Sequence, residues 1–162
     1  MVITTATSIR YGNYKSLFNK VKELDEIIEP NIQTICELVN VPKDIRIHFR
    51  PIPNKGLIGQ YVSSNFCVEI DPRKGKLDEL LATVCHELVH AEQYYEERLT
   101  SDHKYFYWNG EKFKSTFDND TYLNFPWEIE AYDRQYILYD AAFKDTFLSK
   151  KNNKKRLKRT TI

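Results

Sequence analysis

The first part of the chain repeats its hydrophobic residues at intervals of three and four, which is the period of an amphipathic helix. The pattern runs through residues 13–30, with hydrophobic positions at Leu17, Phe18, Val21, Leu24, Ile27 and Ile28. We expect Pro30 to kink or interrupt this helix, because proline lacks a backbone N–H and its ring clashes with the preceding turn. Residues 31–41 resume the same period. They predict a second helical segment that ends before Pro42.

The period changes to strict alternation in residues 44–53. Hydrophobic and polar side chains alternate along this stretch. The hydrophobic positions are Ile45, Ile47 and Phe49, and the polar ones are Arg46, His48 and Arg50. Such alternation is typical of a strand with one hydrated face. Residues 56–64 and 66–72 follow as two more short strand patterns. The three segments predict a small, mostly antiparallel sheet.

Three further elements are predicted in the second half of the chain. Residues 76–99 return to the helical period, with Asp78 and Glu79 in the first turn, where acidic side chains suit the helix dipole. In residues 105–117 the pair Asn109-Gly110 separates two aromatic-rich segments, which is a strong signal for a β-hairpin. Residues 124–148 then predict a long closing helix with Pro126 in its first turn.

These elements predict an α+β fold in one domain, over residues 1–149. The order is N-terminal helices, a small sheet, a helix, a hairpin and a C-terminal helix. A chain of 162 residues buries enough surface to fold without a disulfide or a metal ion. A metal site in this chain would therefore serve chemistry.

The cysteines and hydrophobic runs bear on the cellular compartment. Cys36, Cys67 and Cys85 are an odd number without a CxxC pair, which argues against a disulfide framework. The first residues lack the basic and apolar regions of a signal peptide. No hydrophobic run approaches the roughly 20 residues that span a bilayer. We therefore expect a cytoplasmic protein without a membrane partner.

The sequence HELVH at residues 86–90 contains candidate metal-binding and catalytic residues. On a helix, His86 and His90 lie one turn apart, so both imidazoles can bind one metal ion. Glu87 lies about 100° away around the helix, where it can reach a metal-bound water without being a ligand. The neighbours of both histidines are apolar, so the imidazoles are expected to be buried, and buried imidazoles need partners. The pattern predicts a Zn²⁺ site.

At these residues the chain resembles the zincin metallopeptidases, and among them the gluzincins. The resemblance covers roughly residues 44 to 140 and includes a second helix that opens with the sequence PWEIEAY. It implies that Glu128 is the third zinc ligand, since gluzincins have a glutamate followed three residues later by alanine or serine and then by aspartate. Ala131 fits this pattern, whereas Tyr132 stands where the aspartate is expected. The sequence of this helix also resembles that of small single-domain zincins encoded by bacteriophages.

Two acidic or basic side chains compete with this assignment. Glu128 shares a helix face with Ala131, whereas Glu130 points away and could either orient a histidine or be hydrated. His103 is the other candidate third ligand, because zincins of the Spartan type use a third histidine soon after the second. His103 and Phe106 match their HGxxF pattern only without the glycine. We favour Glu128.

The predicted site implies peptide hydrolysis. Three protein ligands leave a fourth position for water, and Glu87 acts as general base when that water attacks a carbonyl. The developing oxyanion needs a further donor, for which the candidates in falling order are Tyr132, His103, Tyr107 and Tyr122. An edge strand beside the site, at 56–64 or 66–72, would pair with an extended protein or peptide substrate.

Residues 150–162 form a basic tail. They hold seven of the 24 basic residues, which leaves 17 basic against 23 acidic residues in the rest of the chain. Such a segment serves solubility in most proteins and contacts nucleic acid or a virion protein in others. An alternative function is therefore a structural or virion-associated component with a zincin fold, located in the virion or host cytoplasm if the gene belongs to a phage. The intact Glu87 favours the enzyme.

Overall fold

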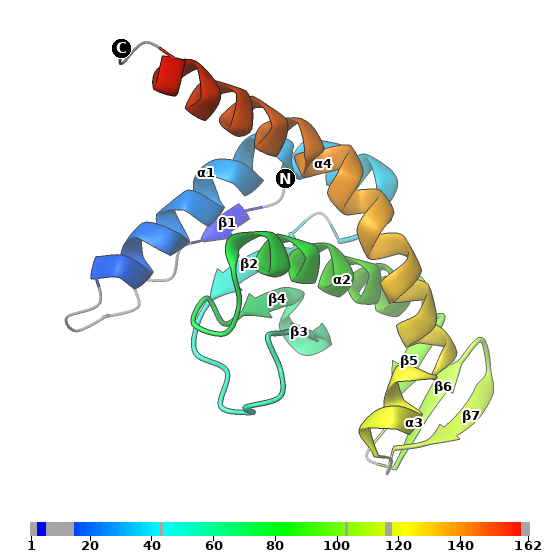
Figure 1. The fold of residues 1–162 in the computed structure, drawn as a ribbon. Helices are drawn as coiled ribbons and strands as arrows, with labels where there is room; N and C mark the ends of the chain where they lie inside the picture. Colours follow the sequence, from blue (N-terminus) through cyan, green and yellow to red (C-terminus); the bar gives the residue numbers. More distant parts are fainter. Residues whose placement is uncertain (1–2, 6–14, 43, 103, 116–117, 160–162) are drawn as a thin grey trace.

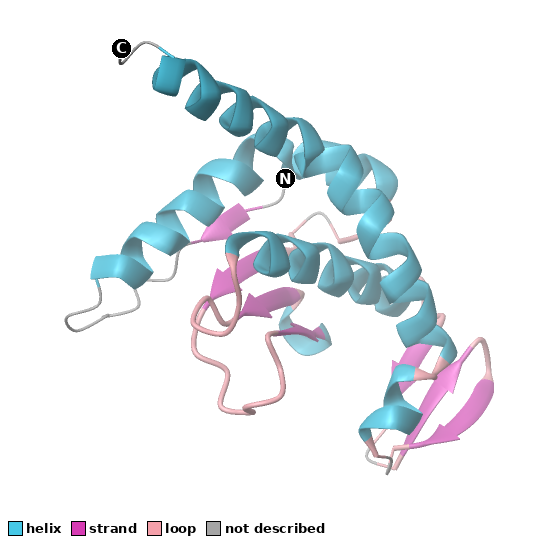
Figure 2. Ribbon diagram, in the orientation of Figure 1, coloured by secondary structure: helices cyan, strands magenta, loops and turns pink. Residues whose placement is uncertain are grey.

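A computed structural model describes residues 3–5, 15–42, 44–102, 104–115 and 118–159. Four helices are described: α1 (Lys15–Leu38), α2 (Leu77–Tyr95), α3 (Asn119–Leu123) and α4 (Pro126–Arg159). Seven strands accompany them: β1 (Ile3–Thr5), β2 (Arg46–Phe49), β3 (Gly59–Val62), β4 (Cys67–Ile70), β5 (Leu99–Ser101), β6 (Tyr105–Trp108) and β7 (Glu111–Lys114). A 3-10 turn covers Ser63–Asn65. The predicted α+β class is confirmed (Figure 2).

The strands form two sheets. The larger has the order β1-β2-β4-β3, with β1, β2 and β4 parallel and β3 antiparallel to β4. The smaller is an antiparallel sheet of β5, β6 and β7. The larger sheet is mixed, whereas the sequence predicted mostly antiparallel pairing for residues 44–72. The chain passes through β3 between β2 and β4, so β2 and β4 run in the same direction and pair in parallel. Strand β3 is left at the sheet edge.

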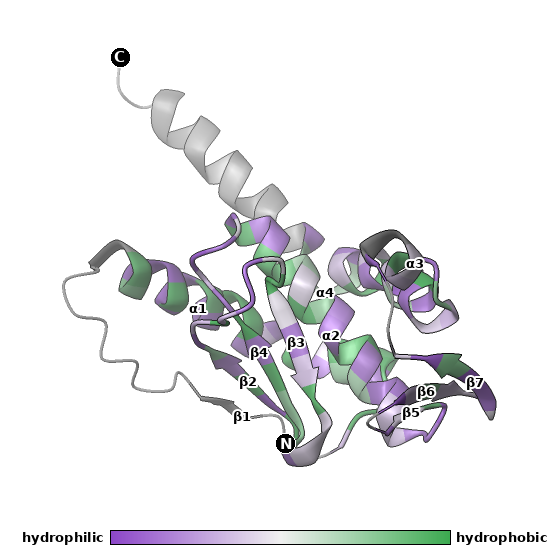
Figure 3. Cartoon of the chain, turned by 90° about the horizontal axis from the view of Figure 1, so that it is seen from below, coloured by the Kyte–Doolittle hydropathy of each residue, from purple (hydrophilic) through white to green (hydrophobic). Residues whose placement is uncertain are grey.

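The core lies between the larger sheet and three helices. Figure 1 shows α2 lying between this sheet and α4, while α1 packs beside them. The hydrophobic positions along α1, β4 and α2 meet there (Figure 3). Leu24, Ile35, Ile47, Leu81 and Val89 are all fully buried. At about 25 cal/mol per Å² of apolar surface, this burial is the main term that fixes α2 and hence its histidines.

Helix α1 differs from the prediction of two segments. It runs unbroken through Pro30. Ile27 and Ile35, before and after the proline, are buried in the same core, and this packing outweighs a proline penalty of about 3 kcal/mol. The side-chain amide of Asn31 also donates to the Ile27 carbonyl at 2.7 Å, which pairs a carbonyl near the disturbed turn.

The predicted turn chemistry is observed at two places. Asn109 and Gly110 have φ values of 48° and 84°, and they join β6 to β7 in a two-residue hairpin. Helix α2 begins after Lys76, whose backbone N–H donates to the Glu79 carboxylate at 2.6 Å and is thereby paired at the helix start. It ends at Tyr95, four residues earlier than predicted, because Glu97 takes a left-handed φ of 58° and turns the chain into β5. Among the described residues, no helix is long and apolar enough to cross a membrane.

Candidate metal centre

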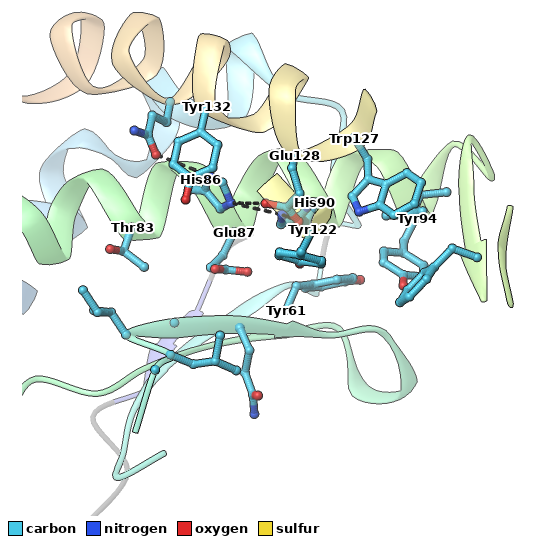
Figure 4. A pocket seen from close by; sticks show the side chains of 18 residues that line it. Tyr61, Thr83, His86, Glu87, His90, Tyr94, Tyr122, Trp127, Glu128 and Tyr132 are labelled. Carbon is cyan, nitrogen blue, oxygen red and sulfur yellow. Dashed lines mark hydrogen bonds and ion pairs between the residues drawn. The ribbon is translucent and has the colours of Figure 1, made fainter. Parts of the chain in front are cut away.

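Helix α2 supplies the two histidines of the site. His86 and His90 are one turn apart, and their Nε2 atoms lie 3.1 Å from each other. The rings are nearly perpendicular, with an interplanar angle of 82°. Both residues are buried, as expected for polar side chains in the middle of a core helix. Their Nε2 atoms therefore converge on one point (Figure 4).

Helix α4 brings Glu128 to the same point. Oε2 of its carboxylate lies 3.4 Å from Nε2 of His86, and Oε1 lies 3.2 Å from Nε2 of His90. One ligand atom from each of the three residues falls within 4.8 Å of the others. Glu128 is only 1% exposed and sits in the first turn of α4, which crosses over α2. Glu128, 38 positions after His90 in the sequence, thus joins both histidines in one buried cluster.

The electrostatics of this cluster suit a cation. Two imidazole nitrogens and a carboxylate that face one another repel unless positive charge lies among them. Burial alone would raise the pKa of Glu128, but the adjacent His86 and His90 outweigh it and lower the pKa to about 2. Burial alone would lower the pKa of His90, but Glu128 and Glu87 raise it to about 9. The buried Oε1 of Glu128 makes no hydrogen bond of good geometry among the described residues, although Nε2 of His90 lies 3.2 Å away. These donors fit a zinc ion, which prefers such nitrogen and oxygen ligands.

Two glutamines, which the sequence did not single out, contact the outer nitrogens of the histidines. Nδ1 of His86 lies 3.2 Å from Oε1 of Gln135, and Nδ1 of His90 lies 2.8 Å from Oε1 of Gln93. The Nε2 amide of Gln93 also donates to the Trp127 carbonyl at 3.0 Å. The one sequence signal for Gln93 is its place one turn after His90.

Trp127 anchors the start of α4 next to Glu128. Its side chain is 1% exposed. It stacks on Phe125 with ring centroids 4.4 Å apart and meets Phe106 and Phe113, each at 5.3 Å. The hairpin of β6 and β7 is thereby docked against the residue that precedes Glu128. This aromatic cluster explains why the small sheet belongs to the site although it contributes no member of the metal-binding trio.

A charged network holds α4 against α2 on the side away from the pocket. Glu92, buried on α2, pairs with Arg134 of α4 and accepts from the backbone N–H of Asn40 at 2.7 Å. Arg98 donates to Glu130 at 2.6 Å, and Arg134 reaches the same carboxylate at 3.2 Å. Glu130 therefore neither orients a histidine nor stands hydrated on its own. It ties α4 to Arg98, in the turn that follows α2.

Glu87 faces the pocket beside the trio (Figure 4). Burial raises the pKa of its carboxyl, against the lowering effect of His90 and His86. The backbone N–H of Tyr61 on β3 donates to the carboxylate. Gly59, also on β3, lies close enough that a Cβ there would be 3.2 Å from Cγ of Glu87. The edge strand thus fixes Glu87 at the wall of the pocket.

The pocket has a volume of about 320 Å³. One wall is edge strand β3, the base is formed by α2, and the opposite side is α4. Its far end is aromatic, lined by Tyr61, Tyr94, Phe106, Tyr122 and Trp127. A groove with an edge strand on one side and the trio at its centre can hold an extended chain.

The predicted oxyanion donors lie in different places. The Tyr132 ring packs on His86 with centroids 4.7 Å apart and borders the pocket, as does Tyr122, which hydrogen-bonds Glu128. Tyr107 is outside the pocket lining, and its hydroxyl donates to Asp102 at 2.9 Å. His103, the alternative third ligand, lies outside the described residues. Of the predicted donors that the structure describes, Tyr132 and Tyr122 thus border the pocket.

Comparisons with known proteins add one structural likeness. No protein-family model matches the sequence, and no curated protein matches it. Among solved structures, the chain is similar to a mutant of Wss1 from Saccharomyces cerevisiae, with 13% sequence identity and a TM-score of 0.43. The match covers 88% of this chain and 95% of that chain. At this level of similarity the functional argument rests on the geometry of the site alone.

Proposed function

We propose that this protein is a zinc-dependent metallopeptidase with a ligand set of the gluzincin type. The supporting observation is the buried trio of His86, His90 and Glu128 beside a buried Glu87, in a groove bordered by an edge strand. A structural zinc site is usually closed by four protein ligands, whereas a catalytic one keeps a position open. Three ligands that face a pocket of this size favour catalysis.

A zinc ion bound by the trio would lower the pKa of a bound water and polarise a substrate carbonyl. Glu87 would take the proton of that water, a role supported by its position in the same pocket outside the trio. Its raised pKa favours holding the proton and passing it to the leaving amine. The Tyr61 N–H keeps the carboxylate oriented during both steps.

Strand β3 supports a peptide substrate. Among the described residues it is hydrogen-bonded to β4 on one side, and Gly59, Gln60 and Tyr61 line the pocket on the other. An extended peptide laid along such an edge gains backbone hydrogen bonds in any sequence. We infer protein or peptide substrates, with Tyr132 as the donor to the developing oxyanion and Tyr122 as the alternative.

The proposal is tested with the full chain and denatured casein. Zinc-loaded protein should cleave casein, a chelator should stop cleavage, and added zinc should restore it. Parallel assays of Tyr132→Phe and Tyr122→Phe should show the larger loss for Tyr132→Phe. Protein that binds zinc but cleaves neither casein nor other unfolded proteins would contradict the proposal and favour a non-enzymatic role.

A further inference from the structure

The sequence leaves open what supports the two histidines, because Tyr132 stands where gluzincins have an aspartate. An imidazole binds a metal ion only through a nitrogen that carries a lone pair. A hydrogen bond donated by the other nitrogen selects the tautomer in which this is so. The contacts of Gln93 and Gln135 bear directly on this selection.

The orientation of the Gln93 amide is fixed from its far side. Its Nε2 donates to the Trp127 carbonyl, which can only accept, so its Oε1 must face His90. An amide oxygen can only accept as well. In the neutral imidazole, the form that binds a metal ion, the hydrogen between them therefore sits on Nδ1 of His90, and the lone pair is left on Nε2, which faces His86 and Glu128.

Gln135 does the same for the first histidine from another helix. It is buried on α4, two turns after Glu128, and its Oε1 lies 3.2 Å from Nδ1 of His86. The Tyr132 ring packs on the same imidazole. His86 is thus held by α4 at its outer nitrogen and on its ring, while Glu128 of the same helix faces its Nε2.

We propose that Gln93 and Gln135 are positioning residues that hold His90 and His86 in the Nδ1-protonated tautomer and thereby set the zinc affinity of the trio. The inference rests on the proposed zinc site and goes beyond it. Both supports are neutral amides. A carboxylate in the same place would withdraw the Nδ1 proton more strongly, raise the basicity of Nε2 and add negative charge near the ion. The native affinity is therefore intermediate, above that of a site without acceptors and below that of one with a carboxylate.

The test is zinc affinity, measured at one fixed pH by competition with a chromogenic chelator. Gln135→Leu and Gln93→Leu remove the acceptor and should weaken zinc binding by about 10-fold to 100-fold. Gln135→Glu keeps an acceptor and should bind zinc at least as tightly as the wild type. Gln93→Glu should fall between, because it keeps the acceptor for His90 but loses the donor to the Trp127 carbonyl. Gln33→Leu, at an exposed glutamine of α1, is the matched control and should leave the affinity unchanged.

Each outcome decides the inference separately from the enzyme proposal. Leucine variants with wild-type affinity overturn it, and so does a wild type that binds no zinc. If a leucine variant fails to fold, the glutamate variants still decide: Gln135→Glu weaker than wild type by 10-fold or more would overturn it. Tight zinc binding with the expected order of variants but no hydrolysis supports this inference while rejecting the peptidase.

Discussion

Gly59 of β3 lies against Glu87 of α2 at a place where the neighbouring Thr83 and Ile70 leave no room for a side chain. A Cβ atom there would lie 3.2 Å from Cγ of Glu87 and 2.5 Å from Cγ2 of Thr83, both on α2. The missing side chain lets the edge strand approach α2 closely enough for the Tyr61 N–H to reach the Glu87 carboxylate. One contact therefore positions both the edge strand and Glu87, the proposed general base.

Gly59→Ala should separate the edge strand from Glu87 and lower casein hydrolysis on the order of 10-fold to 100-fold, since small displacements at a reacting group carry losses of that size. Zinc affinity should stay at the wild-type value, because the trio is on α2 and α4. Gly75→Ala is the control, since a Cβ there meets nothing nearer than 3.4 Å. Equal activities of the two variants would show that the close approach is unimportant for catalysis.

Glu87→Gln should keep the fold and the bound zinc while losing hydrolysis by about 10²-fold to 10⁴-fold. The amide has the same shape but cannot accept the proton from water. Initial rates of casein cleavage at equal zinc occupancy measure the effect. An active Glu87→Gln enzyme would remove Glu87 from the mechanism.

Asp71→Asn should destabilise the protein, because Asp71 organises the chain that leads into β3. The carboxylate is fully buried and accepts from the Ile52 N–H at 2.9 Å and from the Arg73 guanidinium at 2.6 Å. Burial alone would raise its pKa, but these donors outweigh burial and lower it to about 2. Against an unfolded value of about 3.9, this shift contributes about 2 to 3 kcal/mol at pH 7.

The pH dependence of that contribution has a definite sign. A carboxyl whose pKa is lower in the folded state stabilises it above the unfolded pKa, and the effect is lost as pH falls from about 4 toward 2. Urea unfolding of wild type and Asp71→Asn should thus differ most at neutral pH and converge in acid. Asp140→Asn, which breaks an exposed pair with Lys144, should change stability by less than about 1 kcal/mol at any pH. If the difference in free energy of unfolding between wild type and Asp71→Asn did not change with pH, the lowered pKa of Asp71 would not be the cause.

Deletion of residues 150–162 tests the basic tail. If its seven charges contact nucleic acid, full-length protein should bind DNA weakly and without sequence preference, with a log–log salt slope of several units. The truncated protein should lose this binding and keep its hydrolysis rate, since the trio and Glu87 lie before residue 150. Because α4 runs to Arg159, a variant with glutamine at the seven basic positions controls for lost helix length. DNA binding that survives both changes would show that the basic tail is not the nucleic-acid contact.

Local patterns allowed much of this architecture to be predicted. The helical period placed His86 and His90 on the buried side of α2, Asn109-Gly110 predicted the hairpin, and Pro126 marked the start of α4. These features depend on residues within a turn or two of one another. The meeting of Glu128 with the histidines was expected from family resemblance, and the described structure brings the three together.

Long-range packing accounts for what the sequence did not predict. The parallel pairing of β1 with β2, the unbroken α1 and the pairing of Glu130 with Arg98 all depend on partners distant in the chain. Gln135 and His86 are 49 positions apart. No periodicity marks such contacts, because they exist only once α4 has crossed α2.

Zinc content shows directly whether His86, His90 and Glu128 form the metal site. Wild type, Glu128→Ala and His103→Ala would be loaded with zinc, freed of excess and analysed for bound metal. We predict about one zinc ion per chain in wild type and His103→Ala, and a loss of most zinc from Glu128→Ala. Zinc lost from His103→Ala but retained by Glu128→Ala would contradict the assignment.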